Sequence, residues 1–216
     1  MKRLLAPLAL AALALANGRA APPAEPGPPL LAVAADPAWQ PLFAALAGRG
    51  ALVSRVTERR WFPFRREPIV LDGELRLAPD HGLSLHYARP EERTLIADAR
   101  GLVLRDAAGR DRELPADPRA TALGAALGPI LRFDHGELAR LFTLHGARDG
   151  ADWRLDLVPR DEALGRALGR VTIVGRDTEV RRLEIRQTEK QRVEIEITAT
   201  DTGVIFTAAA LRRYFR

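Results

Sequence analysis

A regular alternation of leucine with other residues runs from Gly73 to Leu104 and restricts what this part of the chain can form. Within the segment GELRLAPDHGLSLHYARPEERTLIADARGLVL, a period of two predicts β-strands whose two faces differ in polarity. The apolar positions are Leu75, Leu77, Leu83, Leu85, Tyr87, Leu102 and Leu104, and Arg76, Ser84, His86 and Val103 lie between them. We expect the leucine face to be buried against a partner and the opposite face to be mostly exposed to water.

Similar patterns predict strands along most of the chain and helices in only a few places. The predicted strands are Leu52–Trp61, Ile69–Ala78, Gly82–Ala88, Arg93–Asp98, Gly101–Asp106, Phe142–Arg148, Asp152–Val158, Arg170–Gly175, Val180–Thr188, Arg192–Ala199 and Val204–Thr207. The predicted helices are Pro37–Ala47 with Asp36 as its N-cap, a helical patch that begins with Asp117 and Pro118, a short helix from Asp134, and Arg160–Leu168. The tail AAALRRYFR forms either a terminal helix or a frayed end. Because the helices are grouped, we predict an α+β fold, an antiparallel sheet with helices on one face.

The first twenty residues have the pattern of a secretory signal peptide. Lys2 and Arg3 precede a short apolar run, and small residues follow it at Gly18 and Ala20. The run is shorter than the ~20 residues that span a bilayer, although a retained anchor is the alternative. We therefore expect residues 1–20 to be a signal peptide, 21–35 a Pro-rich leader and 36–216 a single domain, located in the periplasm.

The net charge argues against one class of function, and the absence of cysteine excludes two kinds of covalent modification. Removing residues 1–20 leaves 33 − 3 = 30 basic residues against 28 acidic ones, a net charge of +2 instead of +5. Basic and acidic residues interleave without forming a stripe, so we do not expect nucleic-acid binding. The chain has no cysteine, which excludes disulfides and a lipid anchor on cysteine.

No arrangement of side chains predicts catalysis. The histidines His81 and His86 are five residues apart and would face opposite sides of a straight strand, which argues against a metal site. The only serines are Ser54 and Ser84, and neither lies in a nucleophile elbow. Ser84 and His86 share a strand face, as a hydrogen-bonded pair or as two exposed polar residues. Asp161 is expected to cap a helix. We predict no enzyme activity, no metal and no cofactor.

The order of segments resembles the LolA-like family of periplasmic outer-membrane lipoprotein carriers. The resemblance is carried by SRVTERR, LDGELRLAPDHGLSL, ARPEERTLIADARGLVL and ATALGAALGPILRFDHGELARLF, in that order, and covers about residues 52–207. It implies a strongly curved antiparallel sheet, an unclosed β-barrel of about 10–11 strands, with helices covering or plugging its hollow. It also implies that the hollow carries acyl chains across the periplasm.

One departure from the family concerns the arginine that precedes the proline at the end of the second strand. In the family this arginine helps to hold the lid and to hand over cargo. Here Ala78 precedes Pro79, and Arg76 is a candidate substitute on the same strand face. The departure favours relatives that export other lipids, such as aryl-polyene or glycolipid products.

These considerations predict two groups of functional residues. The cavity is expected to be lined by Leu75, Leu77, Leu83, Leu85, Leu102, Leu104, Leu123, Leu127 and Ile130, with helix Thr121–Leu131 as a lid. The alternative is that these residues form an ordinary core. Trp61, Phe62 and Phe64 either dock to a membrane or partner, or fold inward.

The expected partners follow from the carrier interpretation. They are an acylated lipid or lipoprotein as cargo, an inner-membrane exporter as donor and an outer-membrane acceptor, with the protein itself a monomer. The alternative function is a non-carrier scaffold or interaction module of an envelope assembly built on the same half-barrel.

Overall fold

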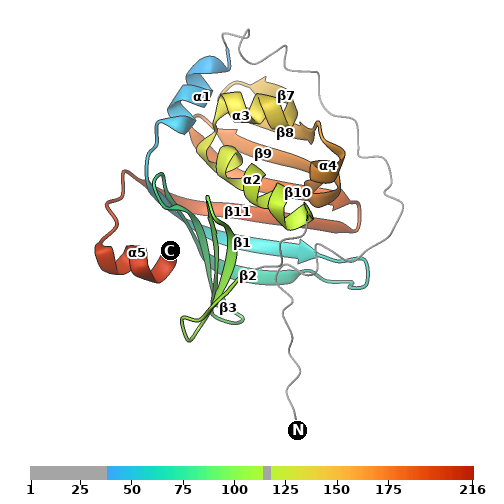
Figure 1. The fold of residues 1–216 in the computed structure, drawn as a ribbon. Coiled ribbons are helices and arrows are strands. Elements are labelled where there is room, and N and C mark those ends of the chain that lie inside the picture. The colour runs from blue at the N-terminus through green and yellow to red at the C-terminus, as the bar shows by residue number, and fades with distance from the viewer. Residues whose placement is uncertain (1–37, 114–117) are drawn as a thin grey trace.

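Eleven strands form one antiparallel sheet in the computed structural model, which describes residues 38–113 and 118–216 (Figure 1). The strands are β1 (Leu52–Trp61), β2 (Ile69–Ala78), β3 (Gly82–Arg89), β4 (Arg93–Asp98), β5 (Gly101–Asp106), β6 (Asp111–Glu113), β7 (Phe142–Asp149), β8 (Asp152–Pro159), β9 (Arg170–Arg176), β10 (Glu179–Thr188) and β11 (Gln191–Thr202). Their order is β6-β5-β4-β3-β2-β1-β11-β10-β9-β8-β7. The first and last strands of the chain pair at the middle, and β6 and β7 are the two unpaired edges. The α+β class and the unclosed sheet are therefore confirmed.

The sheet bends sharply between β2 and β3, and Figure 1 shows β3 running steeply across β1 and β2. The pairing of β2 with β3 shifts register between Asp72 and Gly73, which marks a bulge. A side chain at Gly73 would overlap the carbonyl oxygen of His86, so only glycine allows this close approach. A second register shift lies between Val180 and Arg182 of β10. Bulges increase strand bending, and the sheet acquires a concave face.

Three helices lie over the concave face. They are three of the five helices in the described part of the chain, which are α1 (Gln40–Ala47), α2 (Pro118–Arg132), α3 (His135–Leu141), α4 (Glu162–Leu168) and α5 (Ala208–Tyr214). Figure 1 shows α2, α3 and α4 in front of β8, β9 and β10, and α2 also contacts β4 and β5 at the other side of the bend. Asp134 caps α3 and Asp161 caps α4, each accepting a backbone N–H, as the sequence predicted. Among the described helices, none has the length and apolarity to cross a membrane.

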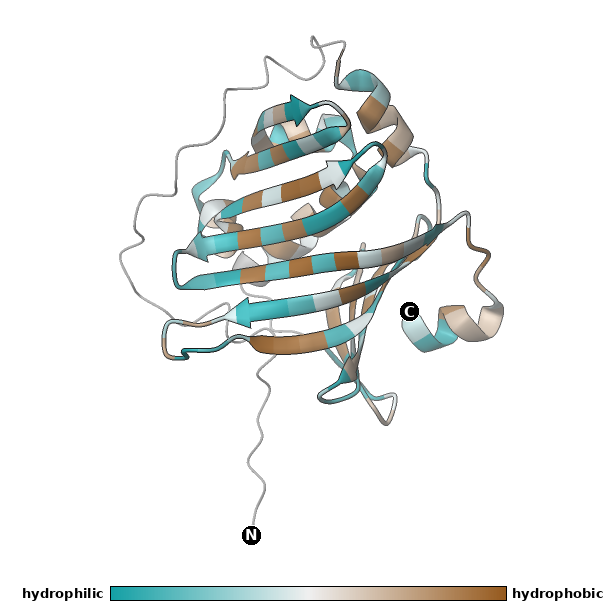
Figure 2. Cartoon of the chain, turned by 180° about the vertical axis from the view of Figure 1, so that it is seen from behind, coloured by the Kyte–Doolittle hydropathy of each residue, from teal (hydrophilic) through white to brown (hydrophobic). Residues whose placement is uncertain are grey.

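The hydrophobic core lies between these helices and the strands. Leu155, Leu157 and Ile173 are at most 1% exposed, and Leu138 and Leu168 pack against them from the helices. Figure 2 shows the alternation of hydrophobic and hydrophilic residues along the strands of this half of the sheet. The period of two thus directs one set of side chains to the core.

The structure differs from the predicted elements in several places. The expected strand at Val204–Thr207 is not a strand, because Gly203 turns away with a positive φ of 68° and Thr207 instead caps α5. The short strand β6 was not predicted, since three charged residues carry no alternation. Helix α1 begins at Gln40 and not at Pro37. The caps expected at Asp36 and Asp117, the signal peptide and the Pro-rich leader lie outside the described residues.

The prediction of a mostly water-exposed second face for β2 to β5 is also wrong. Ser84, Ile96 and Val103 are cross-strand neighbours on this outer face, and each is at most 1% exposed. The residues 204–216, here called the C-terminal segment, lie over it. Arg76 stacks on the Tyr214 ring with its guanidinium carbon 3.6 Å from the ring centroid, and the Phe215 ring lies 6.0 Å from that of His81.

Polar contacts anchor the C-terminal segment. Arg105 donates to the backbone carbonyls of Arg212, Arg213 and Phe215 at 2.7–3.1 Å. Arg216 forms a two-bonded ion pair with Asp98, both distances being 2.7 Å. The tail is therefore a helix, α5, followed by a docked end, and not a frayed terminus.

Candidate functional site

Eight of the nine predicted cavity residues come together in one hydrophobic cluster on the concave face, and Leu104 is not part of it. Cross-strand pairing places Leu75 opposite Leu85 and Leu77 opposite Leu83, and Leu102 follows one strand pair further along. From α2, Leu123 and Ile130 pack into the same cluster, and Leu127 lies partly buried against it. The seven fully buried members, Leu75, Leu77, Leu83, Leu85, Leu102, Leu123 and Ile130, are 1–8% exposed, whereas Leu104 and Leu127 are half-buried. In this conformation the side chains of α2 occupy much of the concavity.

Helix α2 approaches the sheet through small residues. A Cβ atom added at Gly124 would lie 3.7 Å from Cγ of Leu102, an ordinary contact distance. At Gly124 the helix backbone therefore lies close to β5, with room for no more than a methyl group between them. Pro129 lies inside the helix and removes one backbone hydrogen bond from its last turn. The helix ends at Arg132, and the following Phe133 has a positive φ of 51°.

A pocket of about 730 Å³ remains at one end of the concave face. Its floor includes Leu77, Leu83 and Leu102, three of the predicted cavity residues. One wall is the small-residue side of α2, and the other is formed by the turns at Pro79–Gly82 and Asp98–Gly101. The C-terminal residue Arg216 completes its rim. A second pocket, of about 650 Å³, lies between α1 and the start of α3.

A buried polar cluster on the concave face was missed at the sequence level. Glu58 is 2% exposed, forms an ion pair with Arg60 and accepts a 2.6 Å hydrogen bond from the hydroxyl of Tyr87. Arg60 in turn donates to the Tyr87 oxygen at 3.0 Å. Burial, together with the Glu58 carboxylate, raises the pKa of Tyr87. Burial acts to lower the pKa of Arg60, but the charges of Glu58 and Tyr87 and the hydrogen bonds to both residues together outweigh it, so the pKa is raised. Side chains at the even-numbered positions of β1 point to the core. The alternation along this strand could therefore have shown that Glu58 and Arg60 face the core.

The position of the family's lid arginine is apolar in this chain. Ala78 is 4% exposed and directly precedes the turn that faces α2 across the pocket. The hypothesis that Arg76 substitutes for this arginine stays a prediction. Arg76 points to the outer face, where Glu74 and the Tyr214 ring hold it, because it alternates with the core-facing Leu75 and Leu77.

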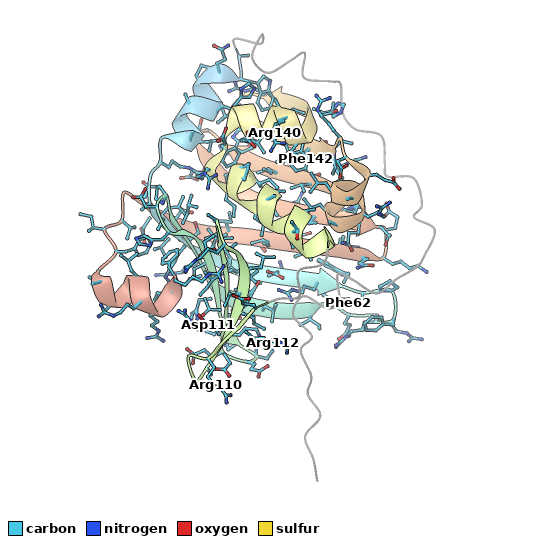
Figure 3. All side chains as sticks on the ribbon, viewed as in Figure 1. Phe62, Arg110, Asp111, Arg112, Arg140 and Phe142 are labelled. Carbon is cyan, nitrogen blue, oxygen red and sulfur yellow. The ribbon has the colours of Figure 1, made fainter. Side chains whose placement is uncertain are left out.

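The three aromatic residues after β1 are not equivalent. Phe62 is 6% exposed and lies at the end of the strand (Figure 3), whereas Phe64 is 74% exposed. The two rings stack with centroids 5.4 Å apart. Trp61 is half-buried beneath the guanidinium of Arg192, which lies 4.0 Å from its centroid. One aromatic thus folds inward and one points outward.

The polar residues considered for catalysis do not converge. The Oγ of Ser84 has no hydrogen-bond partner, and His86 bonds to Thr94 at 3.0 Å instead, so the Ser84–His86 pair does not form. Burial, with the nearby Arg76 charge, lowers the pKa of His86. Among residues 38–113 and 118–216, no group of three or more His, Cys, Asp or Glu side chains is placed to hold a metal ion.

Three solved structures are similar to this chain at low sequence identity. A domain described as an outer membrane lipoprotein-sorting protein from Vibrio parahaemolyticus is 10% identical, with a TM-score of 0.43, covering 79% of this chain and 92% of its own. A LolA superfamily protein from Nitrosomonas europaea is 6% identical, with a TM-score of 0.39 and coverages of 77% and 94%. LprF from Mycobacterium bovis is 15% identical, with a TM-score of 0.38 and coverages of 80% and 96%.

At the level of sequence, no curated protein matches the chain. The sequence model of one protein family, described as "Outer membrane lipoprotein carrier protein LolA-like", matches residues 31–216. Because that match covers most of the 216 residues, this protein belongs to the LolA-like family.

Proposed function

We propose that this protein is a periplasmic carrier that shields the acyl chains of a lipid or lipoprotein and passes them from the inner to the outer membrane. The observation that carries the proposal is the leucine-lined concave face, whose leucines on β2, β3 and β5 are covered by helix α2 and which is open at one end as a pocket. Membership of the LolA-like family supports the same role. An inner-membrane donor and an outer-membrane acceptor are part of the proposal.

The free energy of removing an acyl chain from water is large, so a carrier needs such an apolar face. Each buried methylene group contributes about 0.8 kcal/mol, so a chain of ~16 carbons contributes ~13 kcal/mol when removed from water. Such a cargo cannot cross an aqueous compartment unshielded. The carrier must also release it, so its affinity has to be close to that of a membrane. A face formed by the leucines of β2, β3 and β5 holds acyl chains without forming specific polar bonds to them, and so meets both demands.

We propose that helix α2 moves when the protein takes up its cargo. In the empty protein its Leu123 and Ile130 fill the concavity and avoid exposing an apolar surface. On loading, acyl chains would replace these side chains on Leu75, Leu85 and the other strand leucines. The contact through Gly124 offers little side-chain interlocking, which lets the helix leave the sheet without breaking a polar network.

A disulfide between α2 and β5 tests this directly, because the chain has no cysteine of its own. In a Leu102→Cys/Gly124→Cys variant the two side chains are in contact, within reach of a disulfide. We expect the oxidised variant to lose uptake of a fluorescent C16 fatty acid, and the reduced variant to regain it. Non-reducing electrophoresis verifies the crosslink.

The matched control is a disulfide that joins two strands and does not involve α2. Ser54 and Thr200 face each other across β1 and β11, with their hydroxyl oxygens 2.8 Å apart. A Ser54→Cys/Thr200→Cys variant should take up the fatty acid in both redox states. Equal uptake by the oxidised and reduced α2 variant would show that this helix is no lid. Failure of the wild type to take up any acyl probe would overturn the carrier role and favour a scaffold in an envelope assembly.

A further inference from the structure

Large hydrophobic side chains are strongly exposed at only three places in the described residues. Phe64 is 74% exposed, Val70 is 48% exposed and Ile205 is 93% exposed. Two of them, Phe64 and Val70, belong to the same hairpin, in and just after the loop that joins β1 to β2. We call residues Phe62–Pro68 the β1–β2 loop. An exposed phenylalanine is costly in water, so its setting indicates whether it has a use.

The β1–β2 loop holds Phe64 in a defined position. The ring stacks on that of Phe62 at an interplanar angle of 23°, and Phe62 is itself anchored at 6% exposure. The backbone N–H of Arg65 donates to the carbonyl of Phe62 at 3.1 Å and closes a turn around Phe64. Pro63 and Pro68 restrict the backbone at both ends of the loop. The phenylalanine is therefore presented outward on a rigid base.

Positive charge surrounds the exposed ring. Arg65 and Arg66 are both exposed and follow Phe64 directly. The adjoining end of the sheet adds Lys190 and Arg192, since Arg192 pairs with Trp61. Residues 61–68 and 188–192 together hold four basic and two acidic side chains, a net charge of +2.

We propose that the β1–β2 loop docks the protein on a membrane surface rich in anionic lipids, with Phe64 entering the interface and Arg65 and Arg66 contacting headgroups. A single aromatic residue flanked by arginines suits a bilayer interface, where the ring enters the headgroup region and the guanidinium groups stay in water. A stable protein–protein contact would need about 800 Å² of complementary surface on each side, far more than one ring offers.

This inference rests on the proposed carrier role only in that a carrier must reach a membrane. The β1–β2 loop precedes β2, whereas the pocket-lining turn at Pro79–Gly82 follows it, so the two lie at opposite ends of that strand. Docking therefore leaves the pocket accessible. Changes in the loop should alter membrane binding without altering acyl uptake.

Vesicle co-sedimentation of the full chain without its first twenty residues tests the proposal. The probes are vesicles of phosphatidylcholine alone and vesicles with a third of phosphatidylglycerol. Phe64→Ser should lower the partition coefficient on the anionic vesicles about tenfold. Arg65→Ala/Arg66→Ala should lower it about thirtyfold on anionic vesicles and hardly at all on neutral ones. Binding should weaken with added salt.

Two control variants match these changes in chemistry. Ile205→Ser removes a more exposed apolar side chain, and Arg181→Ala/Arg182→Ala removes two consecutive exposed arginines on β10. Both should bind vesicles as the wild type does. If the wild type does not bind anionic vesicles, or if the controls lose as much binding as the loop variants, the inference is overturned. Fatty-acid uptake, measured on the same samples, reports separately on the carrier proposal.

Discussion

The C-terminal segment offers the sharpest quantitative prediction, through substitution of Phe215 by alanine. Phe215 is 1% exposed, and its ring lies 5.5 Å from that of Phe206 and 6.0 Å from that of His81. Truncating a buried phenylalanine to alanine costs about 3–5 kcal/mol when the surroundings stay in place. The substitution should therefore weaken the docking of the C-terminal segment on the outer face of the sheet by this amount of free energy.

The C-terminal segment follows β11 and contributes no strand to the sheet, so it can detach while the sheet remains folded. A loss of about 3 kcal/mol raises the detached population at least a hundredfold, since about 1.4 kcal/mol corresponds to a factor of ten. The measured fall in global stability should stay below the full 3–5 kcal/mol, because once detached the segment has no further docking energy to lose.

Limited trypsin digestion followed by intact-mass measurement checks this, because Arg212 and Arg213 lie in the segment. When detachment is fast compared with cleavage, the cleavage rate follows the detached population. Phe215→Ala should therefore be clipped in the segment at least a hundredfold faster than the wild type. Phe64→Ala, which alters an exposed phenylalanine elsewhere, should leave this rate unchanged. An unchanged rate for Phe215→Ala would refute the reasoning.

Three further predictions concern other parts of the sheet. The hydrogen bonds from Arg216 lower the pKa of Asp98 to about 2. The ion pair therefore stabilises the fold fully above the ordinary pKa of 3.8, and this stabilisation is lost as the pH falls toward 2. Thermal unfolding between pH 2 and 5 should be less pH-dependent in Asp98→Asn. Tyr87→Phe leaves the buried Glu58 carboxylate without its hydroxyl donor and should cost about 1–3 kcal/mol in urea unfolding. Gly175→Ala would place a Cβ atom inside the contact distance of the Trp153 indole and should lower stability by about 1–3 kcal/mol or more, seen as a lower Tm; a wild-type Tm would contradict the packing.

Local signals in the sequence were enough to predict most of the helices and strands of this protein. Alternation with a period of two identified ten of the strands, because the pleat sends neighbouring side chains to opposite faces whatever the partner is. Asp134 and Asp161 marked two helix starts, because a cap bonds to N–H groups only three residues away. Two consecutive exposed arginines, Arg181 and Arg182, interrupt the alternation of β10 where its pairing with β9 shifts register.

Tertiary structure decided what those faces meet. The outer face of β2 to β5 is buried because the C-terminal segment returns to it, and its anchors join residues more than a hundred positions apart, such as Asp98 and Arg216. No local pattern specifies such pairs. The cluster of Glu58, Arg60 and Tyr87 likewise depends on the register of three strands. The sequence marked both Phe62 and Phe64 as candidates, but only the packed fold buries one and leaves the other in water, because burial depends on the room that distant neighbours leave.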